Sequence, residues 1–272
     1  MIKFPNCKIN LGLHVTQKRA DGFHDIETVF YPVAINDVLE IITSKNNTTQ
    51  LHSSGIGIAG NANDNLCIKA YNLLKQGFNN LPAVDIYLQK NIPAGAGLGG
   101  GSADGAYTLL LLNEKYNLGL SEQQLINYAL RLGSDCPFFI KNTPCYATGR
   151  GEVLQPVDTD LSGYKIVIIN PGIHINTGRA FSNITPARPQ SSLQINIALP
   201  VTRWKNIIVN DFETAVFAAH PSMQKIKEDL YAAGAVYAAM TGTGSTFFGV
   251  FNKDEKVNVS VDKSWMLREV EV

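Results

Sequence analysis

Five glycines fall within seven residues near the middle of the chain, and a serine follows them at once. They are Gly95, Gly97, Gly99, Gly100 and Gly101, with Ser102 next in the sequence. A strand-like segment precedes them and an apolar helical segment follows. Backbone N–H groups at a helix start, with no side chains in the way, bind anions such as phosphate. The alternative is a flexible hairpin loop in which glycine only tolerates a positive φ. The flanking strand and helix favour phosphate binding.

The glycines do not complete either of the two best-known nucleotide motifs. Gly95, Gly97 and Gly100 satisfy G-x-G-x-x-G, but that motif needs an acidic residue at the end of the next strand. Glu114 has about the right separation, yet it lies at the end of the helical segment. A P-loop beginning at Gly95 would need lysine where Gly101 stands. The loop is therefore a candidate of another type.

Two charged residues are of the types that phosphoryl transfer requires. Phosphoryl transfer to an alcohol requires a proton acceptor and positive charge near the migrating group. Asp135 follows a helix terminator and precedes Cys136-Pro137, which places it at a fixed joint, although a surface turn is the alternative. Lys8 interrupts an apolar strand, where it could also be an edge-strand lysine that prevents aggregation.

Three motifs in order resemble those of the GHMP kinases, a superfamily of small-molecule kinases. They are Lys8-Ile9-Asn10-Leu11, the P-x-G-x-G-L-G-G-G-S-A stretch of residues 93–103, and Met240-Thr241-Gly242-Thr243-Gly244-Ser245. Two further motifs, residues 20–24 and 132–139, resemble the branch that phosphorylates 4-diphosphocytidyl-2-C-methyl-D-erythritol in the non-mevalonate isoprenoid pathway. The resemblance covers essentially the whole chain.

The resemblance implies an α+β, two-domain GHMP kinase fold. Its N-terminal half, residues 1–155, would be ribosomal protein S5 domain 2-like and bind ATP, and its C-terminal half, residues 156–272, would be ferredoxin-like. The polar, turn-rich residues 152–163 are the expected joint.

The same resemblance implies residue roles for catalysis and nucleotide binding. Asp135 would be the catalytic base, and Lys8 would pair with it and with the acceptor hydroxyl. The residues expected around ATP are Asn65, Lys90, Pro93, Gly95, Gly97, Leu98, Gly99, Gly100, Gly101 and Ser102. Mg²⁺ is expected with ATP, near the Ser102 hydroxyl, but without a dedicated set of protein ligands, because it relies on waters and phosphate oxygens.

For the acceptor, the resemblance implies hydrogen bonds, aromatic stacking and a tight turn near the substrate phosphates. The residues are Asn10, Phe23, His24, Asp135, Thr177, Phe181, Gly242, Thr243 and Gly244. A cytosine ring offers two faces for stacking and one edge for hydrogen bonding. Many relatives carry Tyr at the position of Phe23, so one hydrogen bond would be lost here. Core packing is the alternative role for both phenylalanines, and a plain hairpin for the glycines.

Two other functions remain open at this point. The chain could be a GHMP kinase for mevalonate, homoserine or a sugar, although an aromatic clamp is useless for an acceptor without a nucleobase. It could also be a non-catalytic ligand sensor on the same fold, although a sensor does not need Lys8 and Asp135.

Composition excludes several other classes. The 272 residues are 45% hydrophobic, and 23 basic residues balance 23 acidic ones, so no basic excess favours nucleic acid or an anionic membrane. The four cysteines have no metal-site or disulfide spacing, and no apolar run is long enough for a signal peptide or a membrane span. We expect a cytoplasmic enzyme with reduced thiols and a small-molecule substrate, as a monomer or homodimer.

Strands and helices must alternate to position these residues. Strands are predicted at residues 7–15, 38–43, 84–93, 165–172 and 235–240, and another after the glycines of residues 242–244. Helices are predicted at residues 63–77 with Asn63 or Asp64 as cap, after the glycine loop, at 121–133 with a Ser121/Gln124 capping box, from near Asn176, and at 222–233. Residues 184–194 are expected to be a loop.

Overall fold

The computed structural model describes residues 1–58 and 60–272, which form two compact units. Unit 1 comprises residues 1–7, 35–94 and 99–143, and unit 2 comprises residues 8–34, 95–98 and 144–272. Residues 155 and 156, between which the sequence suggested a domain boundary, both belong to unit 2, because strand β8 (Val153–Pro156) pairs with β7 (Cys145–Thr148) of the same unit.

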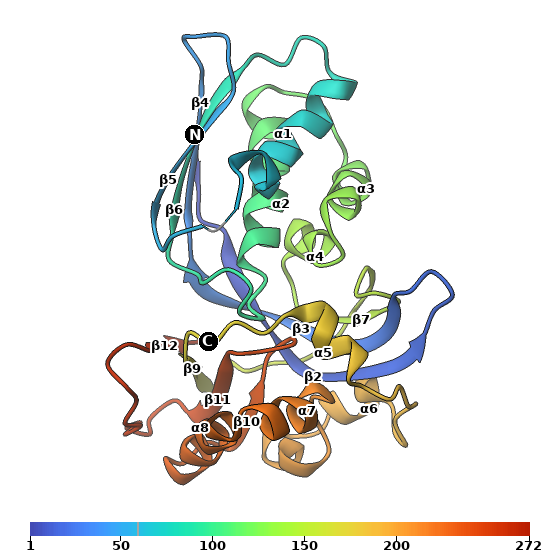
Figure 1. Ribbon diagram of the computed structural model, residues 1–272, viewed down its shortest axis with the longest axis vertical. Helices are drawn as coiled ribbons and strands as arrows, with labels where there is room; N and C mark the ends of the chain where they lie inside the picture. The colour runs from blue at the N-terminus through green and yellow to red at the C-terminus, as the bar shows by residue number, and fades with distance from the viewer. Residues whose placement is uncertain (59) are drawn as a thin grey trace. The chain divides into compact units, whose positions relative to one another are not determined.

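Unit 1 is a four-stranded sheet with helices packed on one face (Figure 1). The strand order is β1 (Ile2–Lys3), β4 (Val38–Thr43), β6 (Val84–Lys90), β5 (Gln50–Gly55), and only the β5–β6 pair is parallel. The helices are α1 (Leu66–Gly77), α2 (Gly100–Lys115), α3 (Glu122–Leu132) and α4 (Cys136–Lys141), with the short 3-10 turn η1 (Ala62–Asp64) before α1. Alternation explains the sheet: Val84, Ile86 and Leu88 of β6 are buried, while Tyr87 faces outward.

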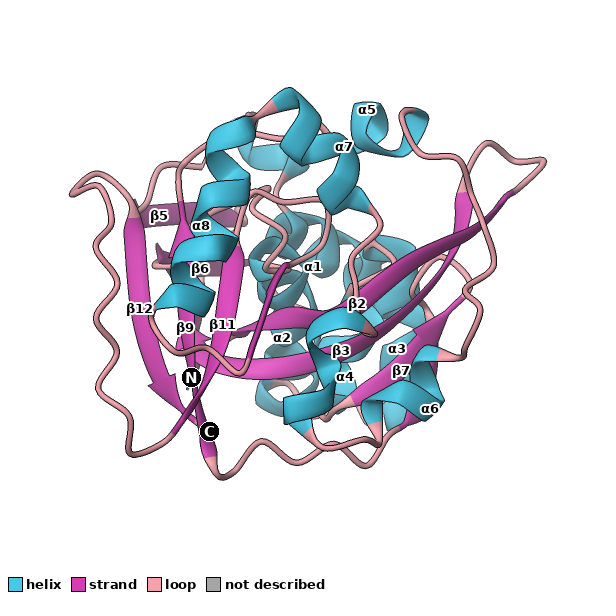
Figure 2. Cartoon of the chain, turned by 90° about the horizontal axis from the view of Figure 1, so that it is seen from below, coloured by secondary structure: helices cyan, strands magenta, loops and turns pink. Residues whose placement is uncertain are grey.

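Unit 2 contains two four-stranded sheets. One has the order β2 (Asn6–Lys18), β3 (His24–Asn36), β7, β8, and the first two strands begin or end in unit 1. The other is fully antiparallel, in the order β10 (Tyr237–Met240), β11 (Phe247–Asn252), β9 (Tyr164–Asn170), β12 (Met266–Glu271). Figure 2 shows α8 (Pro221–Ala232) lying across this sheet, against β10 and β11. The remaining helices are α5 (Thr177–Ser182), α6 (Leu193–Ile197), η2 (Val201–Asn206) and α7 (Phe212–Ala219).

Most predicted elements are confirmed, with differences at their ends. The Ser121/Gln124 capping box starts α3, and the Asn176 side chain caps α5. Neither Asn63 nor Asp64 caps α1, because η1 occupies those residues and the Asn65 side chain accepts from the Cys67 N–H. The expected loop at residues 184–194 runs into α6, and the expected joint at residues 152–163 contains β8.

All four cysteines are buried thiols in the described part of the chain. Within residues 1–58 and 60–272, none of the helices is both long enough and apolar enough to cross a membrane.

Candidate active site

The glycine loop changes unit between Leu98 and Gly99, so each part is described with its own unit. In unit 1, Gly99 precedes α2 with φ 70°, a left-handed conformation that glycine adopts without strain, and it provides no side-chain cap. The first N–H groups of α2 therefore have no side-chain acceptor at the cap. A Cβ on Gly101 would meet no atom within 4 Å. This helix start is open to an anion.

Two further predicted site residues, Ser102 and Asp135, belong to unit 1. Ser102 lies in the first turn of α2 and hydrogen-bonds with the Cys136 thiol. Burial is the main cause that raises the pKa of Cys136 to about 12, so this thiol stays neutral and is not a nucleophile. Asp135, the predicted base, is half-buried at the N-cap of α4, and its side chain makes no capping hydrogen bond.

Lys90 lies in a buried ion cluster of unit 1 that sequence reasoning did not find. Its ammonium, 3% exposed, donates to Asp37 and, at 2.7 Å, to Asp104 of α2. Burial alone would lower the pKa of Lys90, but the charges and hydrogen bonds of Asp104 and Asp37 outweigh it and raise the pKa. The Lys90 ammonium therefore holds two carboxyl groups together, and its predicted contact with ATP stays a prediction. Asn65, also predicted at ATP, uses its side-chain oxygen to cap α1.

The cluster also holds the strand end that leads into the glycine loop. Asp37 Oδ1 accepts from the N–H groups of Asn91 (2.6 Å) and Ile92 (2.9 Å). A Cβ on Gly100 would lie 2.7 Å from Ile92 Cγ2, so the loop packs too closely there for a side chain. Desolvation by burial raises the pKa of Asp104 to about 7. The positive charge of Lys90 lowers this pKa, and the nearby Asp37 carboxylate raises it.

In unit 2, the first and third predicted motifs and Gly97 meet around one amide side chain. Asn10 Oδ1 accepts from Lys8 Nζ (2.7 Å), the Gly242 N–H (2.9 Å) and Thr241 Oγ1 (3.0 Å). Lys8 Nζ also donates to the Gly97 carbonyl at 3.0 Å. Lys8 and Asn10 lie two residues apart on β2 and so share a face.

The Asn10 amide bonds to protein groups, and its expected contact with the substrate stays a prediction. Asn10 is 1% exposed, and its Nδ2 donates to Thr28 Oγ1 at 2.8 Å, so its polar atoms serve the protein. Lys8, 3% exposed, is not an exposed edge lysine. A Cβ on Gly97 would lie 2.1 Å from the Thr241 carbonyl oxygen, so only glycine permits this approach of two loops.

The aromatic residues predicted at the acceptor also lie in unit 2. Phe23 is 51% exposed at the turn between β2 and β3, which excludes a core role, and the Arg150 guanidinium lies 4.0 Å from its ring centroid. The rings of His24 and Phe181 stack at 5.0 Å. Phe181 is half-buried, packs against the hydrophobic core and meets Phe212 edge-on. Phe181 thus touches both the core and His24, and the two alternatives for it are not exclusive.

Thr177 and Thr243 also approach each other, with 3.5 Å between their hydroxyl oxygens. Lys8 lies in unit 2 and Asp135 in unit 1, so their predicted pairing stays a prediction. Arg150 was missed from the sequence, since an isolated arginine in a Gly-Arg-Gly turn gives no signal.

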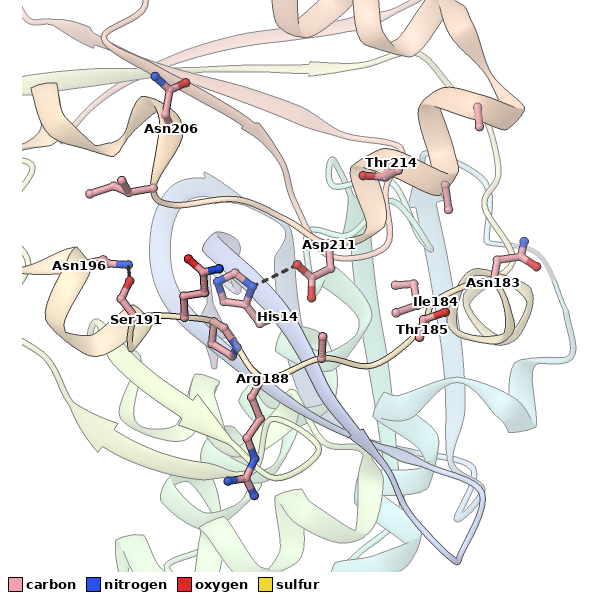
Figure 3. Close-up of a pocket in the computed structure, with 16 residues that line it drawn as sticks. His14, Asn183, Ile184, Thr185, Arg188, Ser191, Asn196, Asn206, Asp211 and Thr214 are labelled. Carbon is pink, nitrogen blue, oxygen red and sulfur yellow. Dashed lines mark hydrogen bonds and ion pairs between the residues drawn. The ribbon is translucent and has the colours of Figure 1, made fainter.

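A cavity of about 750 Å³ in unit 2 lies on another part of β2 (Figure 3). His14 Nδ1 and Asp211 Oδ1 are hydrogen-bonded at 3.1 Å on its wall, whereas the Arg188 side chain extends away from them. The Asn196 Nδ2 group donates a hydrogen bond to Ser191 Oγ at 2.8 Å. The polar groups therefore do not converge on one point, and none of them is a predicted site residue.

The fold and these motifs define a class of protein, the small-molecule kinases of GHMP type. The family model for the GHMP kinases N terminal domain matches residues 65–142, and that for the GHMP kinases C terminal matches residues 201–261. These segments lie on opposite sides of the boundary predicted after residue 155 and leave its position open.

Individual relatives narrow this class. The chain is 54% identical over 260 residues to the 4-diphosphocytidyl-2-C-methyl-D-erythritol kinase of Bacteroides fragilis, covering 94% of each chain. It is 30% identical, with a TM-score of 0.75, to a crystal structure of 4-(cytidine 5'-diphospho)-2C-methyl-D-erythritol kinase, covering 92% of this chain and 90% of the other. Mevalonate kinase of Methanococcus jannaschii (TM-score 0.70, 12% identity, 100% and 98% covered) shares the fold alone. The chain belongs to the GHMP kinase family and, within it, to the 4-diphosphocytidyl-2-C-methyl-D-erythritol kinases.

Proposed function

We propose that this chain transfers the γ-phosphoryl group of ATP to the 2-hydroxyl of 4-diphosphocytidyl-2-C-methyl-D-erythritol, giving the 2-phosphate and ADP. The observation that carries this function is the 54% identity to a kinase of that name over 94% of both chains. The features of each unit support the residue roles that follow.

The start of α2 is suited to the phosphates of ATP. Its N–H groups follow a glycine without a capping side chain, and the position of a Gly101 Cβ is open space. A nucleotide phosphate would therefore approach the backbone directly and gain from the partial positive charge of the helix start. Mg²⁺, when bound, would neutralise phosphate charge. In the described part of the chain no three acidic, His or Cys side chains gather as ligands, so it would depend on phosphate oxygens, waters and the Ser102 hydroxyl.

Lys8 and Asp135 would divide the chemistry at the acceptor hydroxyl. The Asp135 carboxylate would accept the hydroxyl proton, and the Lys8 ammonium would stabilise negative charge on the transferring group. Asn10 Oδ1 and the Gly97 carbonyl orient Lys8 Nζ at 2.7 and 3.0 Å. These two oxygens would hold the ammonium in place for that task.

The acceptor's cytosine would be recognised by the aromatic residues of unit 2. His24 and Phe181 already stack at 5.0 Å, and Phe23 is exposed beneath the Arg150 guanidinium. An aromatic face contributes about 1–3 kcal/mol for a stacked base. These residues would make the nucleobase, rather than the alcohol alone, the feature that the enzyme selects.

A coupled ADP-release assay with a panel of alcohols tests this function. We expect turnover with the cytidine diphosphate ester and none with mevalonate, homoserine or galactose at the same concentration. Comparable turnover of mevalonate would reject the proposed acceptor. ATP binding without turnover of any alcohol, in a preparation with a cooperative melt, would instead support a ligand sensor.

A further inference from the structure

The segment Asn210–Glu213, where α7 begins, makes contacts that the proposed function does not use. Asn210 is 2% exposed, and its Nδ2 donates to two carbonyls of the third motif, Met240 O and Gly242 O, both at 2.8 Å. Its Oδ1 accepts from the Phe212 N–H, the first of α7, at 3.0 Å. One side chain thus joins the helix start to the glycine turn.

Glu213, three residues after Asn210, also bonds to the third motif. Its Oε1 accepts from the Met240 N–H at 2.8 Å, and Lys227 Nζ binds its other oxygen at 2.6 Å. The Gly242 peptide is therefore held on both sides: Asn10 accepts from its N–H, and Asn210 donates to its carbonyl. The same Asn10 oxygen accepts from Lys8 Nζ.

We propose that Asn210 is a positioning residue for the active site, which fixes the Gly242 peptide and, through Asn10, the Lys8 ammonium. The geometry demands such a restraint, because a Cβ on Gly242 would lie 2.9 Å from Gly97 Cα and the two loops have little freedom there. The assignment of this turn to the substrate phosphates rests on the proposed function. The restraint itself rests only on contacts within unit 2.

Asp211 provides a matched control from the same segment. Its side chain points into the cavity of Figure 3, where it binds His14 Nδ1 at 3.1 Å and the Val15 N–H at 2.8 Å. Asp211 therefore makes the same kind of strand contact as Asn210 but does not touch residues 240–242. A general loss of packing in this segment should affect variants of both residues alike.

The test compares Asn210→Asp with Asp211→Asn in the full chain. Asn210→Asp retains an oxygen for the Phe212 N–H, but it sets a second oxygen against the Met240 and Gly242 carbonyls. We expect kcat/KM for the cytidine diphosphate ester, per folded molecule from the thermal melt, to fall about 10-fold to 100-fold in Asn210→Asp and less than 3-fold in Asp211→Asn. Equal kcat/KM values in the two variants would overturn the proposal. If Asn210→Asp does not fold, Asn210→Ser, which keeps an acceptor oxygen without the charge, takes its place.

Hydrogen–deuterium exchange separates this inference from the proposed function. In the free protein, amides of residues 240–246 should exchange at least 10-fold faster in Asn210→Asp than in the parent chain. In Asp211→Asn, the exchange rates of these amides should be the same as in the parent chain. Unchanged exchange in Asn210→Asp would overturn the inference even if the parent chain turns over the ester. Faster exchange in a chain that turns over no ester would support the restraint and reject the function.

Discussion

Two buried lysines, one in each unit, differ in the groups that hold them, and only Lys8 is proposed to take part in the chemistry. Lys8 and Lys90 are each 3% exposed and each lies on a strand. Lys90 is held by the carboxylates of Asp37 and Asp104. Lys8 is held by Asn10 Oδ1 and the Gly97 carbonyl, and its ammonium lies 5.1 Å from the centroid of the Phe30 ring.

The difference lies in what the partners connect. The carboxyl groups of Asp37 and Asp104 hold the Lys90 ammonium, and Asp37 extends the cluster to the backbone of Asn91 and Ile92. Amide and peptide oxygens orient the Lys8 ammonium and connect it to the glycine loop and to the third motif. Burial alone therefore does not distinguish the two lysines, whereas the segments to which their partners connect do.

Lys90→Met removes the lysine that holds the buried carboxyl groups, and it should lower the free energy of unfolding more than any other change proposed here. It leaves two buried carboxylates without their cation, and breaking a buried pair in this way costs about 3–5 kcal/mol. Urea unfolding should show this loss, while kcat per folded molecule stays close to that of the parent chain. A stable Lys90→Met variant with a selective loss of ATP affinity would instead return Lys90 to the nucleotide site.

Lys8→Met should show the opposite pattern. The change removes the donor to Asn10 Oδ1 and to the Gly97 carbonyl, and a buried acceptor left without its donor costs about 1–3 kcal/mol, so the loss of stability should be smaller than in Lys90→Met. Removing a group that stabilises transition-state charge should lower kcat by about 10²- to 10³-fold. The two Met variants, measured side by side, form the control for each other. Normal turnover by Lys8→Met would end its assignment to the chemistry.

Asp135→Asn tests the proton acceptor and its coupling to Lys8. The change is nearly isosteric at a half-buried position, so the melting temperature should be unchanged, while kcat falls by about 10²-fold. The double variant with Lys8→Met measures coupling: two residues that act together lose less in combination than the sum of their separate losses. Strictly additive losses would contradict their predicted pairing.

The sequence predicted elements where a local signal exists. The Ser121/Gln124 capping box and the alternation in residues 84–88 each depend on nearby residues, and both were correct. The start of α7 was missed because its N-cap residue, Asp211, makes no side-chain capping hydrogen bond, while the Asn210 amide next to it bonds to Met240 and Gly242, thirty and thirty-two residues away. The short helix α6 was missed because a Pro/Ser/Gln composition reads as loop.

For the site, the motifs identified Lys8, Asn10, Gly97 and Gly242 as candidate residues, but they did not show which groups each residue contacts. That Asn10 orients Lys8 rather than facing solvent depends on Thr28 and Thr241, which carry no motif signal of their own. The Asp37–Lys90–Asp104 cluster joins residues 53 and 14 positions apart, and no spacing rule predicts it.

Gly101→Ala should have a smaller and more selective effect on the nucleotide. The added methyl group would enter open space at the start of α2, where the phosphates of ATP are proposed to bind, so we expect the KM for ATP to rise about 10-fold, or about 1.4 kcal/mol. Gly163→Ala is the matched control, because its Cβ also meets no atom within 4 Å but lies in a turn of unit 2. An equal KM for ATP in both variants would place the phosphates elsewhere.

Asp104→Asn should have the smallest effect on turnover, and its result should be a change in how stability depends on pH. Desolvation by burial raises the pKa of Asp104 from 3.8 to about 7, so the folded chain binds this proton more tightly than the unfolded chain. The stabilisation from this proton is therefore complete at low pH and is lost as pH rises from about 4 to about 7. Urea unfolding at pH 5, 6, 7 and 8 should show the parent chain losing stability relative to Asp104→Asn up to pH 7, with a constant difference above it. The opposite slope would mean that attraction to Lys90 outweighs burial and keeps Asp104 ionised, which would make this cluster a fully charged one.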